Sequence, residues 1–476
     1  MSGPDEGSEG RSALFPSREE RRGRDDRLTR ALGDADARLV GASVTPAYDA
    51  ARFKRELDAI DFAHPSALED ILSWTIAQME HGVVHITHPR YFGLFNPAPT
   101  FPAQCADRIA AVFNPQLATS TTSPVPVEIE AHVIRAIGRR AGLPPHAAGH
   151  FTSGGSEANY TALLTALVNA DPRFAADGAR VFAGPAVFYV SRDCHLAWIK
   201  IALMAGIGRS AVRLVATDGT GRLDVDALEQ AIAADRANGC VPVMIVATAG
   251  TTNAGMIDPL ARCAAAARRH GLWYHVDAAW GGAVIASERL RGTLAGLEGA
   301  DSVTIDAHKW FATTMGCGMF LTTQPQLLSR TFQVSTAFMP SNIPDLDPYV
   351  TTVQWSRRFL GLRLFLSLAV AGWAGYGAHV ERAVDLIDLA NQRLAVRGWR
   401  TVNDPRLAVL CVVPPARLGD ARSVVSRVVR SGRAWVAAAR FEGQDVVRIC
   451  LTHGETSPDD VAALIEVLDE ASPIGS

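Results

Sequence analysis

Lysine is scarce in this sequence, although positively charged residues are common. Lys54, Lys200 and Lys309 are the only three among 476 residues, against 43 arginines. A guanidinium group cannot form a Schiff base, whereas a lysine amine can, so a retained lysine is a candidate for covalent chemistry. Chance retention is the simpler interpretation for Lys54, which lies in a polar helical stretch.

A strong charge imbalance and a long apolar run are also missing. The formal net charge is −3, which argues against binding to nucleic acid or to an anionic membrane surface. Arg363 and several Gly and Ser residues interrupt the longest apolar stretch, 360–378. That stretch therefore predicts a buried helix and not a membrane span. Because the N-terminus is polar and lacks an apolar signal core, we expect a cytoplasmic protein.

Cysteine is present but follows no functional pattern. The seven cysteines form no CxxC pair and no Cys/His cluster with metal-ligand spacing. We therefore expect reduced, mostly buried thiols and no metal site.

The chain divides into four regions by composition and periodicity. Residues 1–25 are rich in Gly, Arg and Asp and predict a disordered tail. Residues 26–90 have helical periodicity, 91–370 predict a large domain, and 371–476 predict a small C-terminal α+β domain.

Short apolar strands alternate with helical segments in the large domain. The expected strands are 187–190, 212–216, 243–248, 273–277, 303–306 and 318–321. This alternation predicts an α/β fold with a mostly parallel sheet covered by helices. In the C-terminal region, after a long helix near 355–398, we expect strands near 407–413 and 446–451 and a last helix at 458–468.

A turn of small residues begins a predicted helix at 152–159, and its sequence is TSGGSEAN. Glycines let backbone N–H groups approach an anion, and a helix N-terminus favours negative charge. The turn suits a phosphate group, although an ordinary capped helix start has the same composition. His195 follows the next strand, at the end where open α/β sheets bind ligands, and a structural histidine is the alternative there.

Two further strands end in polar residues. Asp277 ends an apolar strand, and a buried carboxylate needs a partner such as the protonated nitrogen of a pyridinium ring. Lys309 lies 32 residues further on, one strand–helix–strand unit, which places both side chains at the same sheet edge. A phosphate cradle, a ring partner and an imine-forming lysine together predict a pyridoxal 5′-phosphate (PLP) enzyme with its Schiff base on Lys309.

Eight segments carry a family resemblance. They are 88–92 (HPRYF), 122–130 (TSPVPVEIE), 152–159, 193–200 (DCHLAWIK), 250–252 (GTT), 275–279 (HVDAA), 308–310 (HKW) and 355–358 (WSRR). On these segments the chain resembles the PLP-dependent group II amino-acid decarboxylases, from about residue 60 to its end. This family includes the decarboxylases of aromatic amino acids, glutamate and histidine.

The resemblance implies an architecture and a cofactor site. The architecture is the α/β PLP-dependent transferase fold type I, which is aspartate-aminotransferase-like, in a homodimer with shared active sites. Catalytic roles fall on Lys309 as the Schiff-base residue, Asp277 as partner of the pyridine nitrogen and His195 stacked on the ring. The other implied cofactor contacts are Ala279 on the opposite ring face, Thr252 near the cofactor O3′ or Asp277, and Gly155, Ser156 and His308 around the phosphate.

The resemblance is less informative about the substrate. Arg357 matches the family arginine that binds the substrate carboxylate, and Leu94 and Asn96 lie in the segment that matches the pocket wall. Family members that act on aromatic amino acids carry aromatic residues at several of these positions, and glutamate decarboxylases carry Gln where Leu94 stands. The amino acid that serves as substrate therefore stays open.

Segment 336–354 matches a family loop that carries a proton-donating tyrosine. Here the usual position holds no tyrosine, and the nearest, Tyr349, aligns with a non-catalytic position. In the family, loss of that tyrosine is associated with aldehyde formation. Decarboxylation of an L-amino acid to the amine and CO2 is the favoured interpretation. Oxidative deamination to an aldehyde, another PLP reaction and a non-catalytic role are the alternatives.

Overall fold

The large domain of the computed structural model, which describes residues 13–334 and 347–470, is built on a seven-stranded sheet. Its strands are β1 (Ala148–Thr152), β2 (Ala186–Ser191), β3 (Val212–Val215), β4 (Val241–Thr248), β5 (Trp273–Asp277), β6 (Ser302–Asp306) and β7 (Gly318–Thr322). Their order is β1-β7-β6-β5-β4-β2-β3, and only β7 runs antiparallel to its neighbours. The predicted mostly parallel sheet is confirmed.

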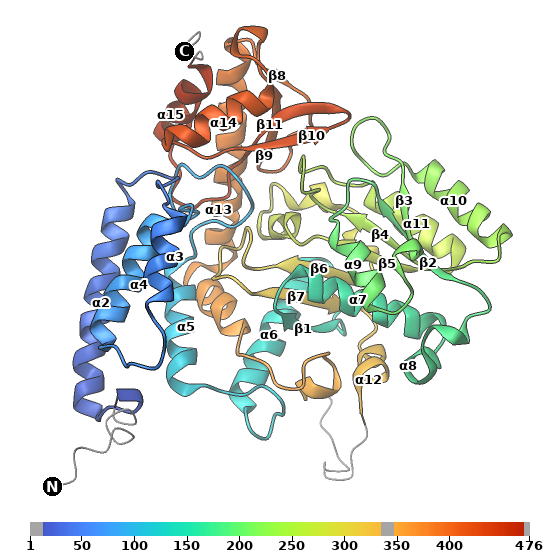
Figure 1. Cartoon of the computed structure of the whole chain (residues 1–476). Coiled ribbons are helices and arrows are strands. Elements are labelled where there is room, and N and C mark those ends of the chain that lie inside the picture. The colour runs from blue at the N-terminus through green and yellow to red at the C-terminus, as the bar shows by residue number, and fades with distance from the viewer. Residues whose placement is uncertain (1–12, 335–346, 471–476) are drawn as a thin grey trace.

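Helices cover both faces of this sheet (Figure 1). They are α6 (Pro124–Arg140), α7 (Gly155–Ala170), α8 (Phe174–Asp177), α9 (Ala197–Met204), α10 (Val225–Ala237), α11 (Leu260–His270) and α12 (Gln326–Phe332). Side chains of β4 alternate between the two cores, as the pleat of a strand requires. Met244 and Val246 join the core under α7 and α9, whereas Ile245 and Ala247 join the core under α11. Burial on both faces explains why these strands are continuous apolar runs.

The small C-terminal domain has an antiparallel sheet of order β10-β11-β9-β8. Its elements are β8 (Arg400–Thr401), β9 (Val409–Val413), α14 (Ala421–Ser431), β10 (Ala437–Phe441), β11 (Gln444–Cys450) and α15 (Pro458–Asp469). The long helix α13 (Gly361–Val396) joins it to the large domain (Figure 1). Gly372, with φ of 61°, interrupts α13 close to residue 370, where we placed the end of the large domain.

The described part of the N-terminal region is helical and includes α2 (Arg18–Leu39), α3 (Ala50–Asp58), α4 (Leu68–Gly82) and α5 (Phe101–Phe113). Helix α2 begins inside the range that we expected to be a disordered tail. Ser17 and Glu20 form a reciprocal capping box there, which satisfies backbone N–H groups at the helix start. Among the helices that the structure describes, none has both the length and the apolar character needed to cross a membrane.

Candidate active site

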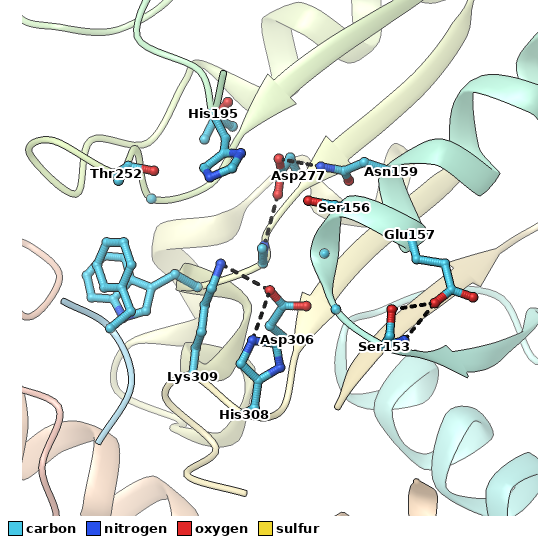
Figure 2. Close-up of a pocket in the computed structure, with 17 residues that line it drawn as sticks. Ser153, Ser156, Glu157, Asn159, His195, Thr252, Asp277, Asp306, His308 and Lys309 are labelled. Carbon is cyan, nitrogen blue, oxygen red and sulfur yellow. Dashed lines mark hydrogen bonds and ion pairs between the residues drawn. The ribbon is translucent and has the colours of Figure 1, made fainter. Parts of the chain in front are cut away.

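A cavity of about 310 Å³ lies at the carboxyl ends of the central strands. Its size falls in the range of about 300–1,000 Å³ that is usual for small-molecule sites. Side chains from β5, the segment after β6 and the start of α7 point into it (Figure 2). All eight predicted cofactor residues line it, namely Gly155, Ser156, His195, Thr252, Asp277, Ala279, His308 and Lys309. The structure thus brings together residues that are up to 154 positions apart in the sequence.

Lys309 enters the cavity from the turn after β6. Its Nζ atom lies 3.0 Å from Oδ2 of Asp306 and 5.9 Å from the ring centre of Phe95. Lys54 and Lys200, the other two lysines, are both exposed and do not line the cavity. Lys309 is therefore the lysine that is placed to react with an aldehyde bound in this cavity.

Asp277 is held from two sides at the end of β5. Its Oδ2 accepts a hydrogen bond from Nδ2 of Asn159 at 2.8 Å, and its Oδ1 accepts one from the backbone N–H of Ala279 at 3.2 Å. Its side chain still lines the cavity although the residue is only 5% exposed. These two bonds fix the carboxylate in one orientation.

A chain of buried hydrogen bonds leads to Asn159. Trp273 Nε1 donates to Ser302 Oγ at 2.8 Å, and Ser302 Oγ lies 2.8 Å from His275 Nδ1. His275 Nε2 lies 3.1 Å from Asn159 Oδ1. Because Trp273 can only donate, a consistent assignment has every group donate toward Asp277. Burial lowers the pKa of His275 to about 4, which keeps the ring neutral as this assignment requires.

The start of α7 forms the end of the cavity that suits an anion. Gly154 precedes the helix and no described side chain caps it, while Gly155 and Ser156 begin its first turn. Ser153 is held aside, because its N–H and hydroxyl donate to Glu157 at 2.8 and 2.7 Å. Free backbone donors and the helix dipole favour a phosphate at this point.

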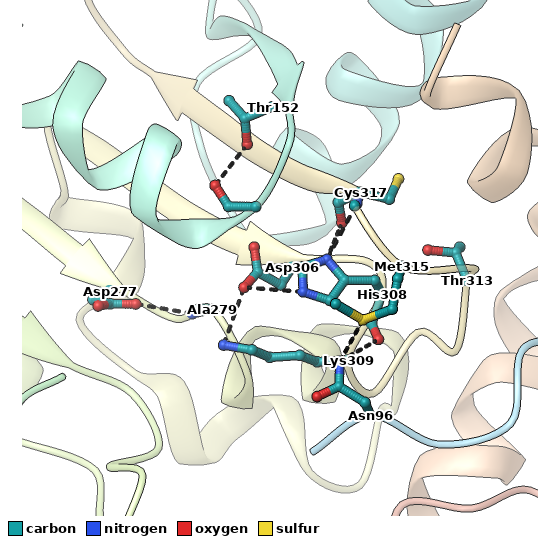
Figure 3. A network of polar contacts seen from close by, with 12 residues as sticks. Asn96, Thr152, Asp277, Ala279, Asp306, His308, Lys309, Thr313, Met315 and Cys317 are labelled. Carbon is teal, nitrogen blue, oxygen red and sulfur yellow. Dashed lines mark hydrogen bonds and ion pairs between the residues drawn. The ribbon is translucent and has the colours of Figure 1, made fainter. Parts of the chain in front are cut away.

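His308 lies at the same end and is fixed by the segment that leads into β7 (Figure 3). Its Nδ1 atom lies 3.0 Å from the carbonyl oxygen and 3.2 Å from the amide nitrogen of Cys317. Burial lowers its pKa, so the ring is a neutral hydrogen-bonding group. A Cβ atom at Gly154 would meet the His308 ring at 3.5 Å, so the histidine lies directly against the turn before α7.

These features fit PLP part by part. The uncapped start of α7 suits its phosphate, Asp277 suits its ring nitrogen, and Lys309 suits its aldehyde. Thr248 also lines the cavity, and its buried hydroxyl has no partner in the described part of the protein, so it offers a further polar contact. Two carboxylates that line the cavity do not fit a phosphate, those of Glu157 and Asp306. Glu157 accepts hydrogen bonds from Ser153 and Gln354, whereas Asp306 lies against Lys309.

The three predicted substrate residues do not line this cavity. Leu94 is 50% exposed, and Asn96 donates to Met315 Sδ at 2.9 Å and to the His308 carbonyl oxygen at 3.4 Å. Arg357 is a clear correction: its guanidinium is buried, 2.8 Å from Glu130 Oε2, and faces a second cavity of about 650 Å³. A guanidinium paired with a buried carboxylate is not available to a substrate in the Lys309 cavity.

Arg448 on β11 is a polar residue that our reading of the sequence missed. It is 2% exposed, lies 4.7 Å above the Phe95 ring and donates from Nε to the carbonyl oxygen of Thr252 at 2.9 Å. Its Nη1 donates to the carbonyl oxygen of Gly93, whereas its buried Nη2 has no partner within the described residues. Phe95 and Thr252, which Arg448 contacts, both line the cavity, whereas Arg448 itself does not. An arginine inside the apolar run 446–451 was the available signal.

The segment that we matched to the catalytic loop is only partly described. Residues 335–346, which include the usual tyrosine position, lie outside the described residues. Tyr349 is 2% exposed, its hydroxyl has no partner among the described residues, and its ring packs 5.0 Å from Trp355. It does not line the cavity of its own chain.

Comparison with known proteins identifies the family. The pyridoxal-dependent decarboxylase conserved domain matches residues 52–411. Mouse cysteine sulfinic acid decarboxylase is 34% identical over 353 residues, covering 72% of this chain and 71% of that protein. L-2,4-diaminobutyrate decarboxylase of Rhizobium meliloti (strain 1021) is 29% identical over 404 residues, covering 83% and 80%.

A solved structure gives the same result for the fold. The crystal structure of mouse CSAD in apo form superposes with a TM-score of 0.85 at 26% identity, covering 94% of this chain and 98% of that chain. This likeness confirms the predicted fold type I architecture. PLP is the cofactor, and the reaction is decarboxylation of an amino acid. The chain belongs to the pyridoxal-dependent decarboxylase family.

Proposed function

We propose that this enzyme converts an L-amino acid to its amine and CO2, with Lys309 as the residue that bonds to the cofactor. The observation that carries this assignment is the convergence of Lys309, Asp277 and the uncapped start of α7 on one cavity. PLP, when bound, supplies the electron sink that allows the bond between Cα and the carboxylate carbon to break. The remaining tasks fall to side chains of the protein.

Asp277 and His195 hold the cofactor ring in this proposal. The fixed carboxylate of Asp277 keeps a proton on the ring nitrogen, which preserves the electron-withdrawing power of the ring. His195 is exposed at the cavity, and its Nδ1 accepts from the backbone N–H of Ala197 at 3.2 Å, which orients its ring. Ala279 lines the cavity with a methyl group small enough to pack on a flat ring.

Arg448 replaces Arg357 as the residue that binds the substrate carboxylate. Three observations support this role, namely its burial, its fixation by two backbone carbonyls, and an Nη2 atom without a partner among the described residues. Arg448 also contacts Phe95 and Thr252, which are part of the cavity wall. A guanidinium held in this way binds a carboxylate with little further loss of conformational freedom. Amino acids with a free α-carboxylate are the substrate class that this arrangement supports.

A homodimer with shared active sites completes the proposal. Its support is the family resemblance and an apolar surface at the two ends of helix α5, where Phe101, Val112 and Phe113 are 74–80% exposed. Contiguous apolar surface marks protein interfaces, so the adjacent pair Val112 and Phe113 is a candidate for the subunit contact. Light scattering should give twice the mass of one chain, and a monomer would contradict the proposal.

A cytoplasmic location is also proposed. It is supported by the free state of all seven cysteines, five of which are buried. Fractionation of the source cells tests it.

The function is tested by incubating the PLP-loaded enzyme with each of the twenty amino acids and analysing products by mass spectrometry. We expect amine and CO2 in equal amounts from at least one of them. Aldehyde, ammonia and O2 consumption in place of amine would show the oxidative alternative. The same assay includes L-2,4-diaminobutyrate and cysteine sulfinate, which the names of two relatives suggest. Release of CO2 from none of these compounds would contradict the proposed class of substrate.

A further inference from the structure

Asp306 places a buried carboxylate at the phosphate end of the cavity. Its Oδ2 atom lies 3.0 Å from Lys309 Nζ and 3.8 Å from His308 Nε2, and its side chain is 2% exposed. Its Oδ1 atom is buried and has no hydrogen-bond partner in the part of the chain that the structure describes. A carboxylate with one ion-pair contact and one unsatisfied oxygen is an unusual group to find beside an anion site.

The carboxylate lies directly against the start of α7. A Cβ atom at Gly155 would meet Asp306 Oδ2 at 2.9 Å, and a Cβ atom at Gly318 would meet Oδ1 at 2.7 Å. Both positions therefore require glycine for this packing. A phosphate bound by the first turn of α7 would have the Asp306 carboxylate as an immediate neighbour, at a distance where like charges repel strongly.

Lys309 is the cation that offsets this charge. Burial lowers the pKa of His308, which is therefore neutral. Arg363 is directed elsewhere, to Asp107 Oδ1 at 2.7 Å and to the carbonyl oxygens of Met315 and Gly316. A Lys309 nitrogen that is bonded to the cofactor is no longer the free ammonium that Asp306 pairs with here (Figure 3).

We infer that Asp306 limits how tightly this enzyme holds its cofactor. In the cofactor-free protein Asp306 holds Lys309 as an ion pair, and on loading its negative charge opposes the phosphate at the start of α7. The inference rests on the proposed role of Lys309 and of the α7 turn. It predicts that removing the charge of Asp306 strengthens the binding of phosphate-bearing ligands, whereas most substitutions in a binding site weaken binding.

The test compares cofactor-free wild type, Asp306→Asn and a matched control, Asp301→Asn. Asp301 immediately precedes β6, at the opposite end of this strand, where it accepts from Tyr274 N at 2.8 Å and Gln324 Nε2 at 3.0 Å. Dissociation constants are measured for PLP, for pyridoxal, which lacks the phosphate, and for inorganic phosphate. Thermal unfolding checks that each variant is folded, and Asp306→Ser replaces Asp306→Asn if the latter is not.

Asp306→Asn should bind PLP and inorganic phosphate about tenfold more tightly than wild type, a factor worth about 1.4 kcal/mol. Pyridoxal should gain clearly less, and Asp301→Asn should bind all three as wild type does. Unchanged or weaker PLP binding by Asp306→Asn would overturn the inference. So would equal gains for PLP and pyridoxal, because the phosphate would then play no part. Failure of wild type to bind PLP would instead contradict the proposed function.

Discussion

Asp277, which we propose for the cofactor ring, and Arg448, which we propose for the substrate carboxylate, differ in how their charged groups are held. On the cofactor side, Asp277 is fixed by Asn159 and by a backbone N–H, with a chain of buried donors behind them. Arg448 is fixed by carbonyl oxygens, and its Nη2 has no partner among the described residues. A carboxylate that the protein already holds keeps its orientation when the ligand is absent, whereas a buried donor without a protein partner needs a water or a ligand to satisfy it.

Two of the buried arginines, Arg357 and Arg448, differ in a similar way. Arg357 is paired with the carboxylate of Glu130 and also donates to the carbonyl oxygen of Phe151 at 3.2 Å. Arg448 has carbonyl oxygens and an aromatic ring around it, and its contacts among the described residues include no carboxylate. Burial alone therefore does not indicate a substrate arginine, whereas the absence of a charge partner among the described residues is informative.

The largest effect is expected from Lys309→Arg. This variant keeps the positive charge beside Asp306 but cannot form an imine, so the covalent cofactor and measurable turnover should both be lost. Absorbance of the purified variant in the PLP region, before and after dialysis, is the measurement. Retention of covalent cofactor would show that another residue bonds to it.

The next largest effect is expected from Asp277→Asn. Its kcat should fall by a factor of at least about 100, which corresponds to roughly 2.7 kcal/mol of barrier. The neutral amide keeps the shape of the side chain but cannot hold a proton on the ring nitrogen. Steady-state kinetics and the melting temperature together separate this effect from unfolding. A kcat within about tenfold of wild type would contradict the role given to Asp277.

The two arginines provide a matched pair for the next experiment. Arg448→Lys should raise KM by about tenfold or more with a smaller effect on kcat, because an ammonium lacks the fixed second nitrogen of the guanidinium. Arg357→Met should leave KM within about twofold but cost about 3–5 kcal/mol of stability, because Glu130 would be left buried without its partner. If the two variants exchanged these effects, Arg357 would be the substrate residue.

The smallest effect is expected from Ser302→Ala, at the start of the donor chain. It leaves Trp273 Nε1 and His275 Nδ1 without their partner and should cost about 1–3 kcal/mol of stability. Turnover should fall only a few-fold, because Asn159 and the Ala279 N–H still contact Asp277. Chemical denaturation tests the loss of stability, and kcat of the same preparation tests the change in turnover. An unchanged stability would show that the hydrogen bonds of Ser302 to Trp273 and His275 are not formed.

The sequence predicted six of the seven strands of the large domain because each is a short run made mostly of apolar residues. Strand β1 was missed, because the sequence AGHFT has neither an apolar run nor a clear alternation. It forms because it pairs with β7 in an antiparallel register. This long-range contact has no local signal in the sequence.

The topology of the sheet explains why the cofactor residues could be predicted from the sequence and the substrate residues could not. Lys309, Asp277 and the α7 turn each follow or precede a strand of one sheet, so topology alone brings them to one edge. Arg448 comes from the other domain, and its position depends on how the two domains pack. Asp306 was visible beside Lys309 in the sequence, but its unsatisfied oxygen is a property of the packing around it.

The central claim, that Lys309 bonds to the cofactor, is tested most directly by chemical trapping. The PLP-loaded enzyme is reduced with borohydride, digested, and mapped by mass spectrometry. Because the chain has three lysines, the result has few alternatives. We predict the pyridoxyl mass on the peptide that contains Lys309 and on no other. A label on the peptide of Lys200 or Lys54 would show that a different lysine bonds to the cofactor.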